Sequence, residues 1–191
     1  MIPEIGQFSL VLALFVALAQ GTVPLIGAAR GWGDWMALAG TAANVQFLLV
    51  ITAFACLTQA YVVSDFSVAN VAHNSHTLKP LLYKISGVWG NHEGSMVLWV
   101  SILALFGLAV AQFGDNLPPS LRARVLAIQG LIGAAFLAFI LFTSNPFLRL
   151  DPAPLEGKGL NPILQDPGLA FHPPFLYLGY VGFSMAFSFA V

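Results

Sequence analysis

The chain has 191 residues, of which 58% are hydrophobic and only 8% charged, and its formal net charge is −1. Water-soluble globular domains carry about 25% charged residues. The composition, with a mean hydropathy of +0.84, therefore excludes that class and indicates a multi-span membrane protein, for which we expect no nucleic-acid partner.

Charged side chains mark where the spans end, because a charge at the bilayer centre costs roughly 2.5 to 3.5 kcal/mol. Five intervals lack charges and hold the roughly 20 residues that a spanning helix needs. A membrane leaves no water to satisfy open strand edges, so helices are the expected spanning element. We predict an all-α polytopic bundle of about five transmembrane helices, near residues 5–29, 35–64, 94–114, 125–148 and 167–191.

The first interval has a second interpretation as a cleaved signal peptide. Ala17-Leu18-Ala19 resembles a small-residue cleavage site. However, the residues before the run contain Glu4 and no Lys or Arg, and the run continues to Ala29. We therefore favour a first membrane span.

The second interval is followed by a long loop, residues 65–93, with three of the four histidines. His73 and His76 are three residues apart and would share a face of a helix, but two histidines do not complete a metal site. A solvated polar loop is the favoured interpretation. Cys56, inside the span, is the single cysteine of the chain, so it is read as a small apolar core residue.

The stretch GVWGNHEGSMVLWV, residues 87–100, places a polar cluster directly before the third apolar run. Two interpretations remain open. In one, the carboxylate of Glu93 orients His92 as a ligand. In the other, the pair is a polar helix start, with Glu93 at the positive end of the helix dipole. The candidate docking or signature residues here are Trp89, Gly90, His92, Glu93, Gly94 and Ser95.

A short connection with Pro118 and Pro119 leads to the fourth interval, and the long loop 149–166 follows that interval. Since spans alternate in direction, both long loops must lie on one side of the membrane and both short ones on the other. Lys and Arg are too evenly divided to decide the sides firmly. The positive residues of the short loops favour a cytoplasmic position for these loops. The amino terminus and both long loops would then lie outside.

The fifth interval begins with the most constrained histidine, His172, which precedes Pro173 and Pro174. A residue before proline is pushed out of the α region and prolines suit a first helical turn, so we expect the helix to begin at Pro173. His172 would then project from the lip of the span. It suits axial coordination of haem iron; an interfacial histidine bonded to a loop is the alternative. The candidate haem-docking residues around it are Phe171, Pro173, Pro174, Phe175 and Tyr177.

Aromatic residues gather mainly where the intervals meet the loops, for example Trp32, Trp35 and Trp99. They fit either the ordinary aromatic belt at the headgroup level or an apolar platform for a flat ligand. Composition does not separate the two. The chain also stops at Val191 inside an apolar run without a polar cap, as we expect for part of a larger membrane protein.

Three stretches carry a family resemblance: YKISGVWGNHEGSMVLWV (83–100), ILFTSNPFLRL (140–150) and LNPILQDPGLAFHPPFLYLGYVGFS (160–184). With the opening MIPEIGQFSL and the loop segment DFSVANVAHNS, they resemble the N-terminal portion of CcmF, the membrane haem lyase of cytochrome c maturation. This resemblance covers essentially the whole chain. CcmF belongs with CcmC and CcsA to the haem-handling cytochrome assembly proteins.

The resemblance implies a function. Haem would arrive from the periplasmic chaperone CcmE and be positioned for thioether attachment to the Cys-X-X-Cys-His motif of apocytochrome c, presented by CcmH and CcmI. The location would be the bacterial inner membrane, with the long loops in the periplasm. His172 would be an axial ligand of the transferred haem. A stably bound haem b would need histidines of later spans that these 191 residues lack.

The resemblance also sets limits. One ligand of the transfer site cannot make a complete lyase, and we identify no catalytic residue and no metal other than haem iron. The alternatives are a multi-span transporter or respiratory-complex subunit, and a non-catalytic assembly scaffold. The charge-free spans count against coupled ion transport.

Overall fold

The computed structural model describes residues 1–168 and 170–191, and in this part of the chain the regular structure is helical. The all-α prediction is confirmed. The helices are α1 (Ile2–Arg30), α2 (Gly33–Val62), α3 (Ala69–Asn74), α4 (Leu81–Gly87), α5 (His92–Phe113), α6 (Pro119–Thr143), a 3₁₀ turn (Pro162–Leu164) and α7 (Pro167–Ala190).

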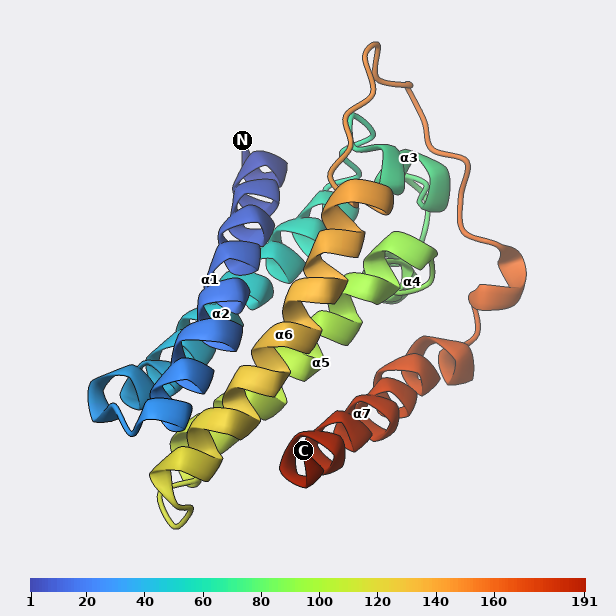
Figure 1. Cartoon of the computed structure of the whole chain (residues 1–191). Helices are drawn as coiled ribbons and strands as arrows, with labels where there is room; N and C mark the ends of the chain where they lie inside the picture. The colour runs from blue at the N-terminus through green and yellow to red at the C-terminus, as the bar shows by residue number, and fades with distance from the viewer.

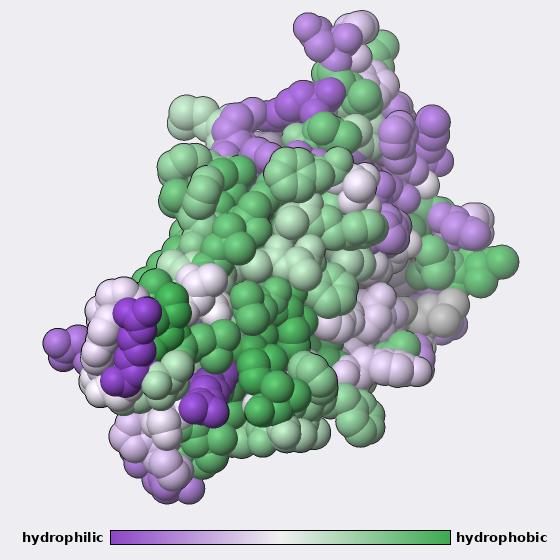
Figure 2. All heavy atoms as spheres, viewed as in Figure 1, coloured by the Kyte–Doolittle hydropathy of each residue, from purple (hydrophilic) through white to green (hydrophobic). Residues whose placement is uncertain are grey.

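Four helices of the described residues are long and apolar enough to cross a membrane: α1, α2, α5 and α6. They correspond to the first four charge-free intervals. The helix α7 covers the fifth interval but is not among these four, so a fifth span stays a prediction. Figure 2 shows hydrophobic side chains over the middle of the helices and hydrophilic ones gathered at the ends, as a bilayer requires.

The four spanning helices form a bundle in which α1 packs against both α2 and α6, and α5 against α2 and α6 (Figure 1). A glycine allows the closest approach. A β-carbon on Gly130 would lie 2.9 Å from the main-chain nitrogen of Gly21, so the backbones of α1 and α6 nearly touch. Such small-residue contacts replace the hydrophobic driving force that helices lack in lipid.

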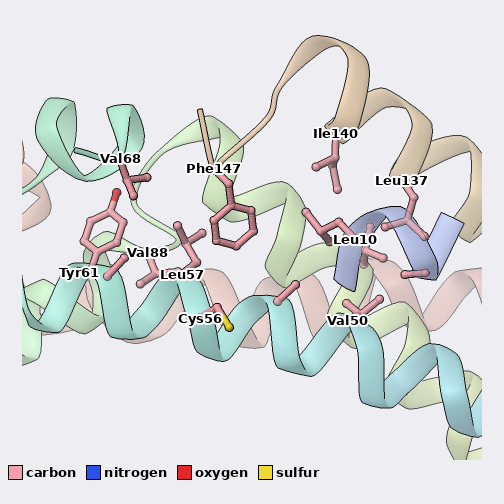
Figure 3. Packing of buried hydrophobic residues seen from close by; sticks show 14 of the residues in the cluster. Leu10, Val50, Cys56, Leu57, Tyr61, Val68, Val88, Leu137, Ile140 and Phe147 are labelled. Carbon is pink, nitrogen blue, oxygen red and sulfur yellow. The ribbon is translucent and has the colours of Figure 1, made fainter. Parts of the chain in front are cut away.

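The largest core cluster lies at the long-loop end of the bundle (Figure 3). Its fully buried members include Leu10, Val50 and Leu57. Phe147, just beyond α6, turns into this cluster against Gly6, whose β-carbon would lie 2.3 Å from the phenylalanine ring. The cluster therefore fastens the end of α6 onto α1 and α2. Cys56 is buried in it, as expected for an apolar core residue.

The fourth helix begins and ends earlier than the charge-free interval 125–148 suggested. Prolines at the first positions are pre-organised for a helix, so α6 starts at Pro119 and includes Arg122. This arginine pairs with Asp115 at 2.9 Å, which keeps its charge at the membrane edge. At the other end, the amide of Phe147 donates to Asn145 Oδ1 at 2.9 Å, and this turn stops the helix.

The two long loops lie side by side at one end of the bundle, as the alternation of spans predicts. The amide of Leu150 donates to the Ser67 carbonyl and that of Ala69 to the Leu148 carbonyl, both at 2.8 Å. Further along, the amide of Lys158 donates to the Ala72 carbonyl at 2.8 Å. The loop before α7 is therefore tied by main-chain bonds to the loop before α5.

The helix α7 begins at Pro167, not at Pro173 as we expected. Pro167 takes the first helical position, which costs no hydrogen bond because the first amides of a helix have no partner inside it. Pro173 and Pro174 therefore lie inside the helix, where proline lacks the N–H that would bond one turn back. The carbonyl that Pro174 leaves without an intrahelical donor belongs to Ala170.

Candidate functional site

One side chain, Asn91, builds the start of α5. Its Oδ1 accepts a hydrogen bond from the Gly94 amide at 2.9 Å, the arrangement of a helix N-cap. Its Nδ2 donates to the carbonyls of Gly87 at 2.8 Å and Val88 at 3.1 Å. A single amide therefore joins the end of α4 to the start of α5 and fixes the turn that carries Trp89.

Gly94 is required by this turn. A β-carbon at position 94 would lie 1.6 Å from the carbonyl oxygen of Val88, closer than any two such atoms can approach. The glycine of the His-Glu-Gly sequence is therefore structural: it lets the backbone before α5 fold back onto the first helical turn.

A buried polar network fastens this turn to α2 and α3. The Tyr61 hydroxyl donates to Asn70 Oδ1 at 2.5 Å, and Asn70 Nδ2 donates to Asn91 Oδ1 at 2.8 Å. Asn70 Nδ2 also lies 3.2 Å from Glu93 Oε2. Fully paired networks of this kind rigidify a site.

Glu93 therefore belongs to the junction of α3 and α5, and no hydrogen bond joins its carboxylate to His92 within the described residues. Of the two interpretations of this pair, the polar helix start is the one found. The carboxylate lies in the first turn of α5, where the helix dipole favours negative charge.

Lys79 lies buried beside this network, against the Tyr61 ring. Only 7% of it is exposed; its Nζ donates to the Asn74 carbonyl at 2.9 Å and lies 5.7 Å from the centre of the Tyr61 ring. Burial, reinforced by the nearby positive charge of Lys84, lowers the pKa of Lys79 to about 8. This group, unlike most lysines, changes charge within reach of physiological pH.

Trp89 connects the turn to α7. Its indole Nε1–H donates to the Ala170 carbonyl at 2.8 Å, the same carbonyl that Pro174 leaves without an intrahelical donor. The ring is stacked on Phe54 of α2, with centroids 6.4 Å apart. The two signature stretches, around Trp89 and around Pro174, therefore meet in one contact that supplies a donor to an otherwise unpaired carbonyl.

A pocket of about 320 Å³ lies beside this contact, between the start of α5 and the first half of α7. Residues from both signature stretches form its walls. They are Ser86, Trp89, Gly90, Asn91, His92, Ser95, Leu164, Ala170, Pro173 and Tyr177.

His92 is shared with a second, apolar hollow of about 380 Å³ on the outer side of α5 and α6, formed with Met96, Ala135, Phe136 and Phe139. Its Nε2 lies 3.0 Å from Ser144 Oγ, and its ring meets Phe139 edge-on, with centroids 6.2 Å apart. The imidazole thus stands between two cavities, held by a hydroxyl at the end of α6.

His172 lies on the opposite, outward face of α7, and it is not part of either cavity. Its side chain is exposed, and no hydrogen bond to it is present within the described residues. Phe171 and Phe175 beside it are 55% and 73% exposed. The Phe-His-Pro-Pro-Phe sequence is therefore divided between two helix faces: Pro173 and Tyr177 face the pocket, whereas His172 and its two phenylalanines face outward.

The histidines of the loop do not join this site. His73 is exposed, and α3 ends at Asn74, so His76 does not continue the same helix face. His76 Nε2 lies 3.9 Å from Glu156 Oε2. Among the described residues, no three His, Cys, Asp or Glu side chains form a group that could hold a metal ion.

Sequence reasoning missed Asn91, Tyr61, Asn70 and Ser144. Asn91 could have been found, because an asparagine shortly before an apolar run is a common N-cap. The other three come from separate helices and carry no local signal that pairs them with residues 89–93.

The fold and site define a class: a polytopic helical membrane protein that presents histidines and exposed aromatic rings at one end of its bundle. The sequence model of the cytochrome C assembly protein family matches residues 89–191. The chain belongs to this family.

Individual relatives support the same family assignment. The cytochrome c-type biogenesis protein ccl1 of Rhodobacter capsulatus is 68% identical over the whole chain, and CcmF of Escherichia coli K12 is 52% identical. A solved structure of cytochrome c heme lyase CcmF superposes with a TM-score of 0.86 at 28% identity, over 98% of this chain. The resemblance to CcmF is confirmed. The chain spans 29% of the length of ccl1 and 30% of that of E. coli CcmF.

Proposed function

We propose that this chain is the part of a membrane haem lyase that holds haem for attachment to cytochrome c. The observation that carries the proposal is the position of His172, an exposed imidazole between two exposed phenylalanines, in a chain that aligns over its whole length with cytochrome c biogenesis proteins. Histidine is a common axial ligand of haem iron, and exposed aromatic rings provide an apolar surface for the porphyrin.

In this proposal haem is the substrate. The His172 imidazole binds one face of the iron, and Phe171 and Phe175 lie along the macrocycle. Each thiol of the Cys-X-X-Cys-His segment then adds across a vinyl group: its sulfur bonds one carbon and its hydrogen goes to the other. The chain contributes position and orientation, which suffice for large rate effects. A second axial ligand and the resident haem b are not supplied by the residues identified here.

The proposed setting is the bacterial inner membrane with both long loops in the periplasm. CcmE would deliver haem to the outward face of α7, and CcmH and CcmI would present apocytochrome c. The apolar helices support the membrane location, and the similarity to CcmF supports the proposed partners and orientation.

The test is covalent haem attachment to a reporter cytochrome c in cells that carry His172→Ala in the full-length protein. We expect attachment to be lost and partly restored by added imidazole. His73→Ala is the matched control, because His73 is also exposed but lies on α3, away from α7. Normal attachment with His172→Ala, at an unchanged protein level in the membrane, would contradict the ligand role and favour an assembly scaffold.

A further inference from the structure

Three glutamines meet inside the bundle, far from the long-loop end. Gln20 comes from α1, Gln46 from α2 and Gln129 from α6. Their exposed fractions are 2%, 6% and 3%. Each belongs to a helix that is apolar enough to cross a membrane, so these amides are withdrawn from bulk water on every side.

Part of this polar group is paired inside the protein. Gln20 Nε2 donates to the Leu126 carbonyl at 2.8 Å, which bridges α1 and α6. Gln129 Nε2 donates to the Ser184 carbonyl at 3.0 Å and to Ser188 Oγ at 2.7 Å, which bridges α6 and α7.

Within this group of glutamines, three amide atoms have no hydrogen-bond partner among the described residues: Oε1 of Gln20, and both Oε1 and Nε2 of Gln46. An unpaired polar atom inside a membrane helix bundle is costly, because neither lipid nor bulk water can satisfy it. Native structures rarely leave such groups alone and commonly pair them with an ordered water.

A cavity of about 10 Å³ lies between these amides. It is lined by all three glutamines and, from α5, by Val100, Leu103 and Gly107. This volume corresponds to roughly one water-sized probe, the smallest space that holds a water molecule. The bound water would also have the two to four polar partners that an internal water needs.

We propose that this cavity is a binding site for one ordered water molecule, which accepts a hydrogen bond from Gln46 Nε2 and donates one to Gln20 Oε1. The water joins α1 and α2 across the centre of the bundle. Because Gln129 at the wall of the same cavity holds α7, the site lies where the polar contacts of four long helices converge. The inference does not depend on haem.

The first test is a structure of the full-length protein in lipid nanodiscs, at a resolution that shows waters. We expect a density peak within hydrogen-bonding distance of both Gln20 Oε1 and the Gln46 amide. No peak, or direct contact between the two amides, would overturn the proposal.

The second test is radiolytic hydroxyl-radical labelling, in which ionising radiation splits a bound water and the hydroxyl radical so formed oxidises the side chains next to it. In the unchanged protein we expect labelling of Leu103, a buried residue that bulk radicals do not reach. Gln46→Met should reduce this labelling at least fivefold, whereas Gln112→Met should leave it unchanged, because Gln112 pairs with Asn44 at an exposed position. Absence of labelling at Leu103 in the unchanged protein, or equal labelling in Gln46→Met, would show that no water is bound.

Discussion

The indole nitrogen of Trp89 lies 2.8 Å from the carbonyl oxygen of Ala170, a residue 81 positions further along the chain. A proline one turn later, Pro174, removes the donor that a continuous helix would have provided to this carbonyl. The contact fixes where α7 lies against the start of α5, and therefore where its outward face presents His172.

Trp89→Phe tests this contact. The variant keeps an aromatic ring against Phe54 but loses the N–H, so we expect about 1 to 3 kcal/mol less stability, because the Ala170 carbonyl is left unpaired. Unfolding in a detergent titration measures the loss. Trp99→Phe is the control. The ring centroids of Trp99 and Phe136 lie 4.0 Å apart, and Trp99 makes no hydrogen bond in the described part of the chain.

Pro174→Ala should reduce the loss of stability that Trp89→Phe causes. The new amide N–H can bond the Ala170 carbonyl within α7, so Trp89→Phe should cost clearly less in this background than in the unchanged protein. Equal costs in both backgrounds would mean that the indole acts by packing alone. A double-mutant cycle on the free energy of unfolding gives the answer.

Gly94→Ala should disrupt the start of α5, since the added methyl group would collide with the Val88 carbonyl. We expect a loss of about 3 kcal/mol, at the upper end of overpacking costs. In the same helix, Gly107 has open space around its β-carbon position, and Gly107→Ala should stabilise by about 0.5 to 1 kcal/mol. Thermal unfolding of both variants is the measurement, and a tolerated Gly94→Ala would show that the turn can move.

Stability should rise with pH between about 8 and the ordinary lysine pKa of about 10.5. In this window Lys79 is neutral in the folded protein and still protonated in the unfolded one, so the unfolded state binds more protons. Below pH 8 the contribution is lost. Lys79→Met should flatten this slope in urea unfolding, whereas Lys158→Met, at an exposed position, should keep it. An unchanged slope in Lys79→Met would assign it to another group.

Gln129→Met should loosen the contact between α7 and α6. The variant removes the hydrogen bonds to Ser184 and Ser188, and since such bonds in membrane proteins average about 0.6 kcal/mol each, we expect a loss of roughly 1 kcal/mol. Limited proteolysis between α6 and α7, compared with unfolding of the whole protein, would show whether the loss is local to α7.

Four of the five predicted intervals coincide, within the described residues, with helices apolar enough to cross a membrane. They could be located because a single physical term, the cost of burying charge, sets where an apolar run ends. The site could be predicted only in part. His172 and Trp89 could be named as candidates, and their roles stay predictions. The hydrogen bond between the Trp89 indole and the Ala170 carbonyl could not be predicted, because nothing local pairs an indole with a carbonyl 81 residues away. The start of α7 was misplaced because the preference of proline for a first turn was assigned to Pro173, while Pro167 satisfies it earlier.

Since the acceptor opposite Trp89 is a main-chain atom, position 170 needs no particular polar side chain for this hydrogen bond, only one small enough for the buried place that Ala170 occupies. Nor does the hydrogen bond involve the outward face, where Phe171, His172 and Phe175 stand. The contact that holds α7 and the outward face of α7 therefore use different atoms of the same helix. The outward surface of α7 can therefore change in sequence without loss of the hydrogen bond that holds the helix against the start of α5.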